Sequence, residues 1–183
     1  MMLSKEDSID LMQRISNQEY AALKLLMKNF SGPLFAFAYR FLGTKELAEE
    51  VVQDVFMNIW RKASDWQPKA QLSTFLFQMT RNRCIDETRK ASFKKYDEIS
   101  HELPDSSVSV SERFEKADRE RLVKQAVFSL PERQKTVLIL CYYEDMSQKE
   151  AASVMKISVS ALEGLLFRAK KALKEMLKKG DVL

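Results

Sequence analysis

Hydrophobic and polar residues follow a helical period along most of this chain. Between Lys45 and Lys62, apolar residues recur at every third or fourth position, which predicts an amphipathic helix with one buried face. The residues expected to face inward are Ala48, Val51, Val52, Val55, Phe56 and Ile59. Comparable periods predict helices over residues 73–90, over residues 132–143 and from residue 158 onward, so an all-α fold is expected.

The first forty residues carry weaker signals for where helices begin and end. A capping-box spacing over residues 16–19 predicts the start of one helix, and Gly32-Pro33 is typical of its end. A second helix is expected to continue from there to Leu42, where Gly43 ends it.

The helical period is lost near the middle of the chain. Residues 92–111 gather serines, acidic residues and a proline, a composition typical of a flexible linker. The sequence therefore predicts two small helical domains, over residues 1–91 and 112–183, joined by this linker. The second domain is expected to begin with a helix from Glu112 to Ser129.

The C-terminal domain carries the pattern of a helix-turn-helix. Ser147 and Glu150 have the spacing of a capping box at the start of a short helix, and a connection over residues 155–157 leads to a second helix. The inward residues of this second helix are expected to be Val159, Leu162, Leu166, Ala169, Leu173 and Leu177. Its outward residues are expected to be Ser160, Glu163, Gly164, Phe167, Arg168 and Lys171. Because the second helix of such a motif meets base edges and phosphates, the pattern predicts DNA binding.

Two of these outward residues each have two explanations. Glu163 can accept a hydrogen bond from cytosine N4, which would contribute sequence choice, or it can close a capping box with Ser160. Gly164 costs a helix about 1 kcal/mol relative to alanine. It either permits a close approach of the backbone to DNA or is a tolerated weak position.

The charge balance agrees with a polyanionic partner. The formal net charge is +4, a modest excess, so charge alone should bind DNA weakly at physiological salt and a further binding surface is needed. No apolar run is long enough to span a bilayer, and the N-terminus lacks a secretory pattern. The sequence therefore predicts a cytoplasmic protein that does not insert into a membrane.

The sequence offers few candidate residues for enzyme catalysis. His101 is the only histidine and lies in a polar stretch, so neither a His-centred triad nor a His-rich metal cluster can be assembled. Cys84 and Cys141 stand in apolar periodic contexts and are expected to be reduced structural thiols. With no Gly-rich phosphate loop either, we expect no catalytic residue, cofactor or metal.

Three motifs, in a particular order, resemble a known family. Ala48–Trp60 is similar to the helix with which bacterial RNA polymerase sigma factors dock on the polymerase clamp, and Phe75–Asp86 is similar to their promoter-opening helix. Leu130–Gln134, Met146–Ala152 and Phe167–Lys170 are similar to their C-terminal domain. The chain resembles, within this family, the compact two-domain extracytoplasmic-function (ECF) group.

The resemblance implies a transcription initiation factor that binds core RNA polymerase and promoter DNA and is held by an inhibitory anti-sigma factor. It implies polymerase binding by Glu50, Gln53, Asp54, Met57 and Asn58. It implies action at the minus-ten promoter element by Trp66, Arg81, Asn82, Arg83, Asp86 and Arg89. It implies reading of the minus-thirty-five element by Ser160, Glu163, Gly164, Phe167, Arg168 and Lys171.

The residues by themselves leave other interpretations open. The polar side of the helix over residues 45–62 is explained equally by a solvated face, and Trp66 can either stack on an extruded base or fold back on the protein. The C-terminal domain also fits a free-standing helix-turn-helix regulator whose N-terminal half serves dimerisation, and a protein-binding helical adaptor is a third interpretation. Many members of the family carry a basic residue where this chain has Glu163, so the resemblance does not imply which bases are read.

Overall fold

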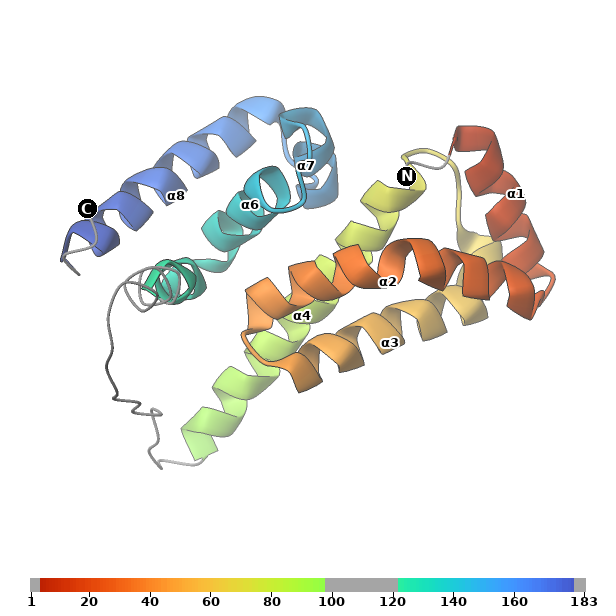
Figure 1. The fold of residues 1–183 in the computed structure, drawn as a ribbon, viewed down its shortest axis with the longest axis horizontal. Helices are drawn as coiled ribbons and strands as arrows, with labels where there is room; N and C mark the ends of the chain where they lie inside the picture. The colour runs from red at the N-terminus through yellow and green to blue at the C-terminus, as the bar shows by residue number, and fades with distance from the viewer. Residues whose placement is uncertain (1–3, 98–121, 180–183) are drawn as a thin grey trace, which may run out of the picture.

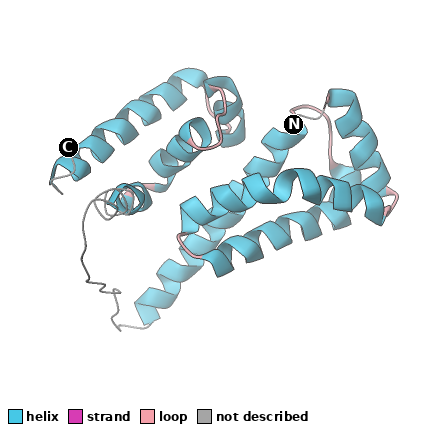
Figure 2. Cartoon of the chain, in the orientation of Figure 1, coloured by secondary structure: helices cyan, strands magenta, loops and turns pink. Residues whose placement is uncertain are grey.

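The computed structural model of this chain describes residues 4–97 and 122–179 (Figure 1). All regular elements in these two ranges are helical, which confirms the all-α prediction (Figure 2). The elements are α1 (Lys5–Ser16), α2 (Tyr20–Leu42), α3 (Lys45–Lys62), the short 3-10 helix η1 (Ala63–Asp65), α4 (Leu72–Asp97), α6 (Glu132–Tyr142), α7 (Gln148–Met155) and α8 (Val159–Lys179), and residues 122–129 form a further helix. Within the described ranges, no helix combines the length and apolar character needed to cross a membrane.

The N-terminal domain is built on three mutually packed helices, α2, α3 and α4, with α1 lying against α2 and α3. At its centre the fully buried Phe37 ring lies 6.0 Å from the Phe41 ring and meets the Phe77 ring edge-on at 5.8 Å, measured between centroids. Helix α3 buries all six residues that the sequence predicted. Its bounds, Lys45–Lys62, are also the predicted ones, so this helix follows its apolar period closely.

Helix α1 is absent from the sequence prediction, and the helix start predicted at residues 16–19 is wrong. Ser16 is the last residue of α1, and a tight turn through Gln18, with φ of 62°, leads to α2. The Glu19 carboxylate accepts from Arg14 Nε at 2.9 Å, a contact across the turn that draws it away from any capping role at Ser16. Ser16 therefore closes α1, while Glu19 is the N-cap residue of α2 but makes no side-chain cap hydrogen bond.

The helix break predicted at Gly32-Pro33 is also wrong, because α2 runs without interruption from Tyr20 to Leu42. A proline disfavours helix partly by a clash between its Cδ and the Cβ of the preceding residue. Gly32 has no Cβ, which removes part of that clash and allows Pro33 to lie inside the helix. The predicted end is confirmed at Gly43, whose φ of 83° is a left-handed conformation that suits glycine.

The predicted linker overlaps the end of α4. The linker was expected from residue 92, whereas α4 continues to Asp97. Its remaining part, residues 98–111, lies outside the described residues, as do His101 and residues 112–121 of the helix expected next. The domain boundaries at residues 91 and 112 stay predictions.

The C-terminal domain packs α6, α7 and α8 together as a helix-turn-helix. The predicted capping box is confirmed, since Ser147 N donates to Glu150 Oε2 at 3.0 Å and Glu150 N donates to Ser147 Oγ at 3.3 Å. Lys156, in a left-handed conformation with φ of 53°, turns the chain from α7 toward α8. Two details of α8 differ from the prediction, because Val159 is exposed and Leu165 is buried.

The two domains touch. Helix α6 lies against α2, and α7 lies against α4 (Figure 1). The apolar period does not predict these contacts, because period identifies the buried face of a single helix and not the domain on which that face packs. The helix-turn-helix of one domain therefore rests on the other domain.

Cys84 provides a chemical test of the N-terminal core. It is fully buried in α4, and burial raises the pKa of its thiol to about 12. Because the thiolate is the form that reacts, we expect iodoacetamide at pH 8 to alkylate Cys84 about a hundredfold more slowly in the folded chain than in urea. Timed samples analysed by mass spectrometry give both rates, with the half-buried Cys141 as an internal comparison. Equal rates for Cys84 in the two states would contradict its burial.

Candidate nucleic-acid interface

Helix α3 presents a polar face to solvent, opposite its buried stripe. The residues that the resemblance implies for polymerase binding are all exposed on this helix: Glu50, Gln53, Asp54, Met57 and Asn58. They are spaced by three and four residues, so they share one side of the helix. Met57, with 43% of its surface exposed, is an apolar residue among polar ones, an arrangement that suits contact with another protein.

Helix α4 changes in character along its length. Its first half contributes fully buried residues such as Leu76 and Thr80 to the core. The residues implied at the minus-ten element follow, and they divide into exposed Asn82, Asp86 and Arg89 and half-buried Arg81 and Arg83. The Asn82 side-chain oxygen accepts from Arg81 Nη1 at 3.2 Å, so these two neighbours orient each other.

Arg83 is held by carboxylates on two helices. Its Nη2 and Nε lie 2.6 Å and 2.7 Å from Asp54 Oδ2 on α3, and its Nη1 lies 2.7 Å from Glu87 Oε1 one turn further along α4. Lys90 Nζ adds a contact to the same Glu87 oxygen at 3.0 Å. The Glu87 side chain is only 13% exposed, which reduces the screening of these ion pairs by water. Arg83 therefore joins α3 to α4.

A small groove lies beside this ion-pair network. Its volume is about 350 Å³, and it runs between the polar faces of α3 and α4. The lining residues are Asp54, Val55, Asn58, Met79, Asn82, Arg83 and Asp86. Residues implied for polymerase binding and residues implied for promoter contact thus line one groove, although they lie far apart in the sequence.

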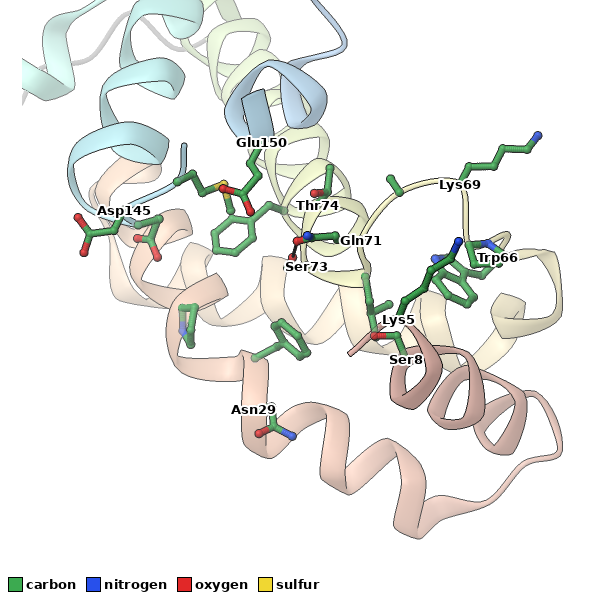
Figure 3. A pocket seen from close by; sticks show the side chains of 18 residues that line it. Lys5, Ser8, Asn29, Trp66, Lys69, Gln71, Ser73, Thr74, Asp145 and Glu150 are labelled. Atoms are coloured by element: carbon green, nitrogen blue, oxygen red, sulfur yellow. Dashed lines mark hydrogen bonds between the residues drawn. The ribbon is translucent and has the colours of Figure 1, made fainter. Parts of the chain in front are cut away.

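A larger pocket, of about 670 Å³, lies beside the loop between η1 and α4. Trp66 lines this pocket while packing part of its ring on the core, so the two alternatives considered for Trp66 are compatible. In Figure 3, Gln71, Ser73 and Thr74 lie between Trp66 on one side and Glu150 on the other. The pocket therefore has one wall from each domain.

Several lining residues of this pocket have no counterpart in the sequence prediction. Lys5 and Ser8 come from α1, while Glu144, Asp145 and Glu150 come from the C-terminal domain. No motif marks them, because they reach the pocket only through the packing of α1 and the contact between domains. The pocket carries lysines on the N-terminal side, Lys5 and Lys69, and carboxylates on the C-terminal side.

Helix α8 exposes every residue implied at the minus-thirty-five element. These exposed residues are Ser160, Glu163, Gly164, Phe167, Arg168 and Lys171. Phe167 has 71% of its surface exposed, and Arg168 Nε donates to the Gly164 carbonyl at 3.1 Å. A Cβ added at Gly164 would meet nothing closer than Arg168 Nη2 at 3.9 Å, so packing within the chain does not require glycine there.

The cap of α8 tests one of the two explanations of Glu163, the capping box. Helix α8 starts at Val159, and Ser158 Oγ accepts from the Ala161 backbone N–H at 3.1 Å. Ser158 is thus the N-cap, and Ser160 lies inside the first turn. Glu163 lies a full turn further on, too far along the helix to serve in a capping box, so the capping explanation is wrong.

Arg81, like Trp66, is a residue of the minus-ten set whose environment involves the second domain. It is half-buried, and its Nε has no hydrogen-bond partner among the described residues. Burial and the nearby Arg133 lower the pKa of Arg81, while Glu132 raises it. The start of α6 therefore lies close to this arginine.

Two family comparisons match the two domains separately. The Sigma-70 region 2 family matches residues 26–94, which include α3 and the first part of α4. The Sigma-70, region 4 family matches residues 120–173, which include the helix-turn-helix. The exposed residues of α3, α4 and α8 described above therefore fall inside the matched segments.

Individual proteins are similar over most of their length. The ECF RNA polymerase sigma factor SigM of Bacillus subtilis is 30% identical, over 78% of this chain and 89% of that protein. The RNA polymerase sigma-H factor of Pseudomonas aeruginosa is 26% identical, over 96% of both chains. Among solved structures, CnrH of Cupriavidus metallidurans in complex with the cytosolic domain of CnrY has a TM-score of 0.67 at 26% identity, covering 92% of this chain and 96% of that chain.

Proposed function

This chain belongs to the ECF family of RNA polymerase sigma factors, and we propose that three of its surfaces divide the work of promoter recognition among them. The chain is a transcription initiation factor, and the polymerase, not the sigma factor, performs the chemistry. The assignment of surfaces rests on the groove between α3 and α4. Residues that the resemblance implies for polymerase binding and residues that it implies for the minus-ten element line this groove together.

The outward face of α3 binds core polymerase. Its exposed polar residues, with Met57 among them, share one side of the helix that the described part of the chain leaves accessible. A protein partner suits this face better than DNA, because Glu50 and Asp54 would be repelled by phosphate.

The second half of α4 and the pocket beside Trp66 open the minus-ten element. Taking a base out of the stack costs a few kcal/mol, so a receiving pocket and an aromatic surface are needed. Trp66 offers the aromatic surface, and the pocket that it lines has one wall from each domain. Exposed Asn82 offers hydrogen bonds to an unpaired base, and exposed Arg89 offers a phosphate contact. Asp86, also exposed, is placed to accept from a base amino group.

Arg83 acts by positioning α4. Its guanidinium is occupied by Asp54 and Glu87 at 2.6–2.7 Å, so its donors point into the protein and not toward a phosphate. A rigid link between α3 and α4 fixes where Asn82 and Asp86 lie relative to the polymerase-binding face.

Helix α8 reads the minus-thirty-five element. The set of exposed residues at its N-terminal half is what a recognition helix presents to the major groove. With the cap supplied by Ser158, the Glu163 carboxylate is available to accept from cytosine N4.

The protein works in the cytoplasm under an anti-sigma partner. The similar protein CnrH was solved with the cytosolic domain of CnrY, which shows that a sigma factor of this shape can be bound by a second protein. The exposed faces of α3 and α8 are the surfaces that such a partner must cover to block polymerase and DNA.

Polymerase binding tests the first surface directly. We expect purified chain to form a stable complex with bacterial core RNA polymerase and to start transcription from a limited set of genomic promoter fragments. The variant Gln53→Ala/Asn58→Ala should bind core about tenfold more weakly, because interface truncations of central contacts have effects of this size. Lys45→Ala, at the start of the same helix, is the matched control. A chain that ignored core polymerase but shifted palindromic DNA would instead be a free-standing regulator.

Base reading by Glu163 can be separated from helix stability. Glu163→Gln should leave the melting temperature unchanged and reduce discrimination for cytosine at one promoter position about fivefold, because an amide can also donate to other bases. Ser158→Ala should do the opposite, costing about 1 kcal/mol of stability with the base preference retained. Thermal unfolding and selection from a randomised promoter pool measure the two effects. If Glu163→Gln lost stability and kept its preference, the assignment would be wrong.

Salt dependence distinguishes the two arginines of α4. Arg89→Ala should reduce the slope of log affinity against log salt by about one, as the loss of a phosphate contact does. Arg83→Ala should leave that slope unchanged and lower the yield of open promoter complexes about fivefold, the effect of one lost charge-assisted hydrogen bond. Both are measured with the reconstituted holoenzyme on one promoter fragment. A reduced slope for Arg83→Ala would make Arg83 a phosphate contact.

A further inference from the structure

The outward surface of α8 consists of two neighbouring rows of exposed residues. Ser160, Gly164 and Arg168 are four residues apart and form one row. Glu163 and Phe167 stand in the other row. Helix α8 packs on α6 and α7 and lies on the side of the C-terminal domain away from α3, which leaves both rows accessible (Figure 1). Because glycine has no side chain, the first row contains a gap between Ser160 and Arg168.

The side chain of Arg168 lies in this gap. Side chains of a helix lean toward its N-terminus, which carries the Arg168 side chain back over the preceding turn. Its Nε donates to the Gly164 carbonyl oxygen at 3.1 Å. Its Nη2 lies 3.9 Å from the position that a Cβ on residue 164 would occupy. The guanidinium therefore lies across Gly164, closer to the start of α8 than its own Cα.

This position of Arg168 requires a small residue at position 164. A Cβ would fit at ordinary contact distance from Nη2, whereas a longer side chain would compete with the guanidinium for the same space. A close approach of DNA to the backbone, the other use of a glycine here, would need the surface at Gly164 to be open, yet the Arg168 side chain lies over it. The space left by the missing side chain is thus used by the chain itself.

The hydrogen bond from Nε determines which donors Arg168 presents to DNA. The guanidinium is planar and carries its N–H donors in a rigid fork. Its Nε donor is occupied by the Gly164 carbonyl, while Nη1 and Nη2 have no hydrogen-bond or ion-pair partner among the described residues. These two groups form an edge that can make paired hydrogen bonds to O6 and N7 of guanine. A side chain already held in place also loses less conformational freedom when it binds.

Glu163 stands in the neighbouring row at nearly the same height along the helix axis. The Arg168 guanidinium lies level with Gly164, so it and the Glu163 carboxylate are separated along the axis by at most about 5.4 Å, one helical turn. Base pairs are stacked about 3.4 Å apart. A guanine contacted by Arg168 is therefore expected within about two base pairs of the cytosine that we assign to Glu163.

We propose that Gly164 is a positioning residue for promoter recognition, because it lets the Arg168 guanidinium lie across α8 and contact a guanine within about two base pairs of the cytosine contacted by Glu163. The proposal rests on the proposed function, in which α8 reads the minus-thirty-five element. With a long side chain at position 164, Arg168 would point outward and meet phosphates, which contribute affinity without sequence information. Gly164 therefore acts on base choice and not on general DNA binding.

Two substitutions at position 164 test this role in the reconstituted holoenzyme. Gly164→Leu places a branched side chain in the space of the guanidinium and should lower the preference for guanine at one promoter position about tenfold, the loss of one paired base contact. Gly164→Ala adds only the Cβ that fits and should keep that preference within about twofold. Selection from a promoter pool randomised in the minus-thirty-five element, followed by affinities for single-base variants of the selected fragment, measures the preference. Alanine and leucine both favour helix more than glycine does, so circular dichroism should show no loss of folding in either variant.

The Arg168→Ala background shows whether Gly164 acts through the arginine. Arg168→Ala should itself remove the guanine preference, and adding Gly164→Leu should then change the remaining base preferences by less than about twofold. The cytosine preference assigned to Glu163 should survive in each of these variants. Its survival separates a misplaced arginine from a misplaced helix.

Several results would overturn the proposal. A guanine preference that Gly164→Leu retains would show that Arg168 does not need the gap, and an equal loss from Gly164→Leu with and without Arg168 would show that the two residues act independently. A Gly164→Ala holoenzyme that bound all fragments more weakly would show that DNA approaches the backbone there. A parent holoenzyme that selected a sequence with no guanine near that cytosine would also contradict it. Failure of the proposed function is distinct, since the parent holoenzyme would then select no sequence at the minus-thirty-five element.

Discussion

The packing of α2, α3 and α4 around the buried Phe37 is the constraint on which the functional surfaces depend. Each helix can bury only one stripe of side chains, so the core determines which residues remain outside. On α3 the buried stripe leaves Asp54 and Asn58 exposed, and on α4 it leaves Asn82 and Asp86 exposed. These four residues line one groove because the two helices are held side by side by their apolar faces.

The surfaces that we propose for polymerase binding and for promoter opening are physically connected in this domain. The ion pairs of Arg83 reach from Asp54 on the proposed polymerase-binding face of α3 to Glu87 on α4. A protein that engages Asp54 therefore acts on a residue whose partner is already fixed to α4. Because this connection consists of ion pairs at the surface, a contact at Asp54 can affect the position of α4 without acting through the hydrophobic core.

The helical period predicted features that depend on residues within a few positions of one another. It did not predict features that depend on contacts between residues far apart in the sequence. The buried face of α3 and the capping box at Ser147 follow from spacing within a few residues, and both are confirmed. The break predicted at Pro33 is wrong, because Gly32 before it has no Cβ to clash with the proline ring and α2 continues.

The candidate site shows the same limit. The exposed residues of α8 could be predicted from one helix, and so could the polar side of α3. The pocket beside Trp66 could not, since Lys5 and Glu144 reach it from opposite ends of the chain and carry no motif. The capping box predicted from Ser160 and Glu163 is wrong, because α8 begins at Val159 and Ser158 Oγ accepts from the Ala161 backbone N–H.

The modest net charge of +4 fits a protein whose DNA contacts act only in combination. Two weak readers joined in one chain bind far more tightly together than apart, provided that both can reach their sites at once. A strongly basic chain would bind DNA through phosphates alone, and its binding would then depend much less on polymerase.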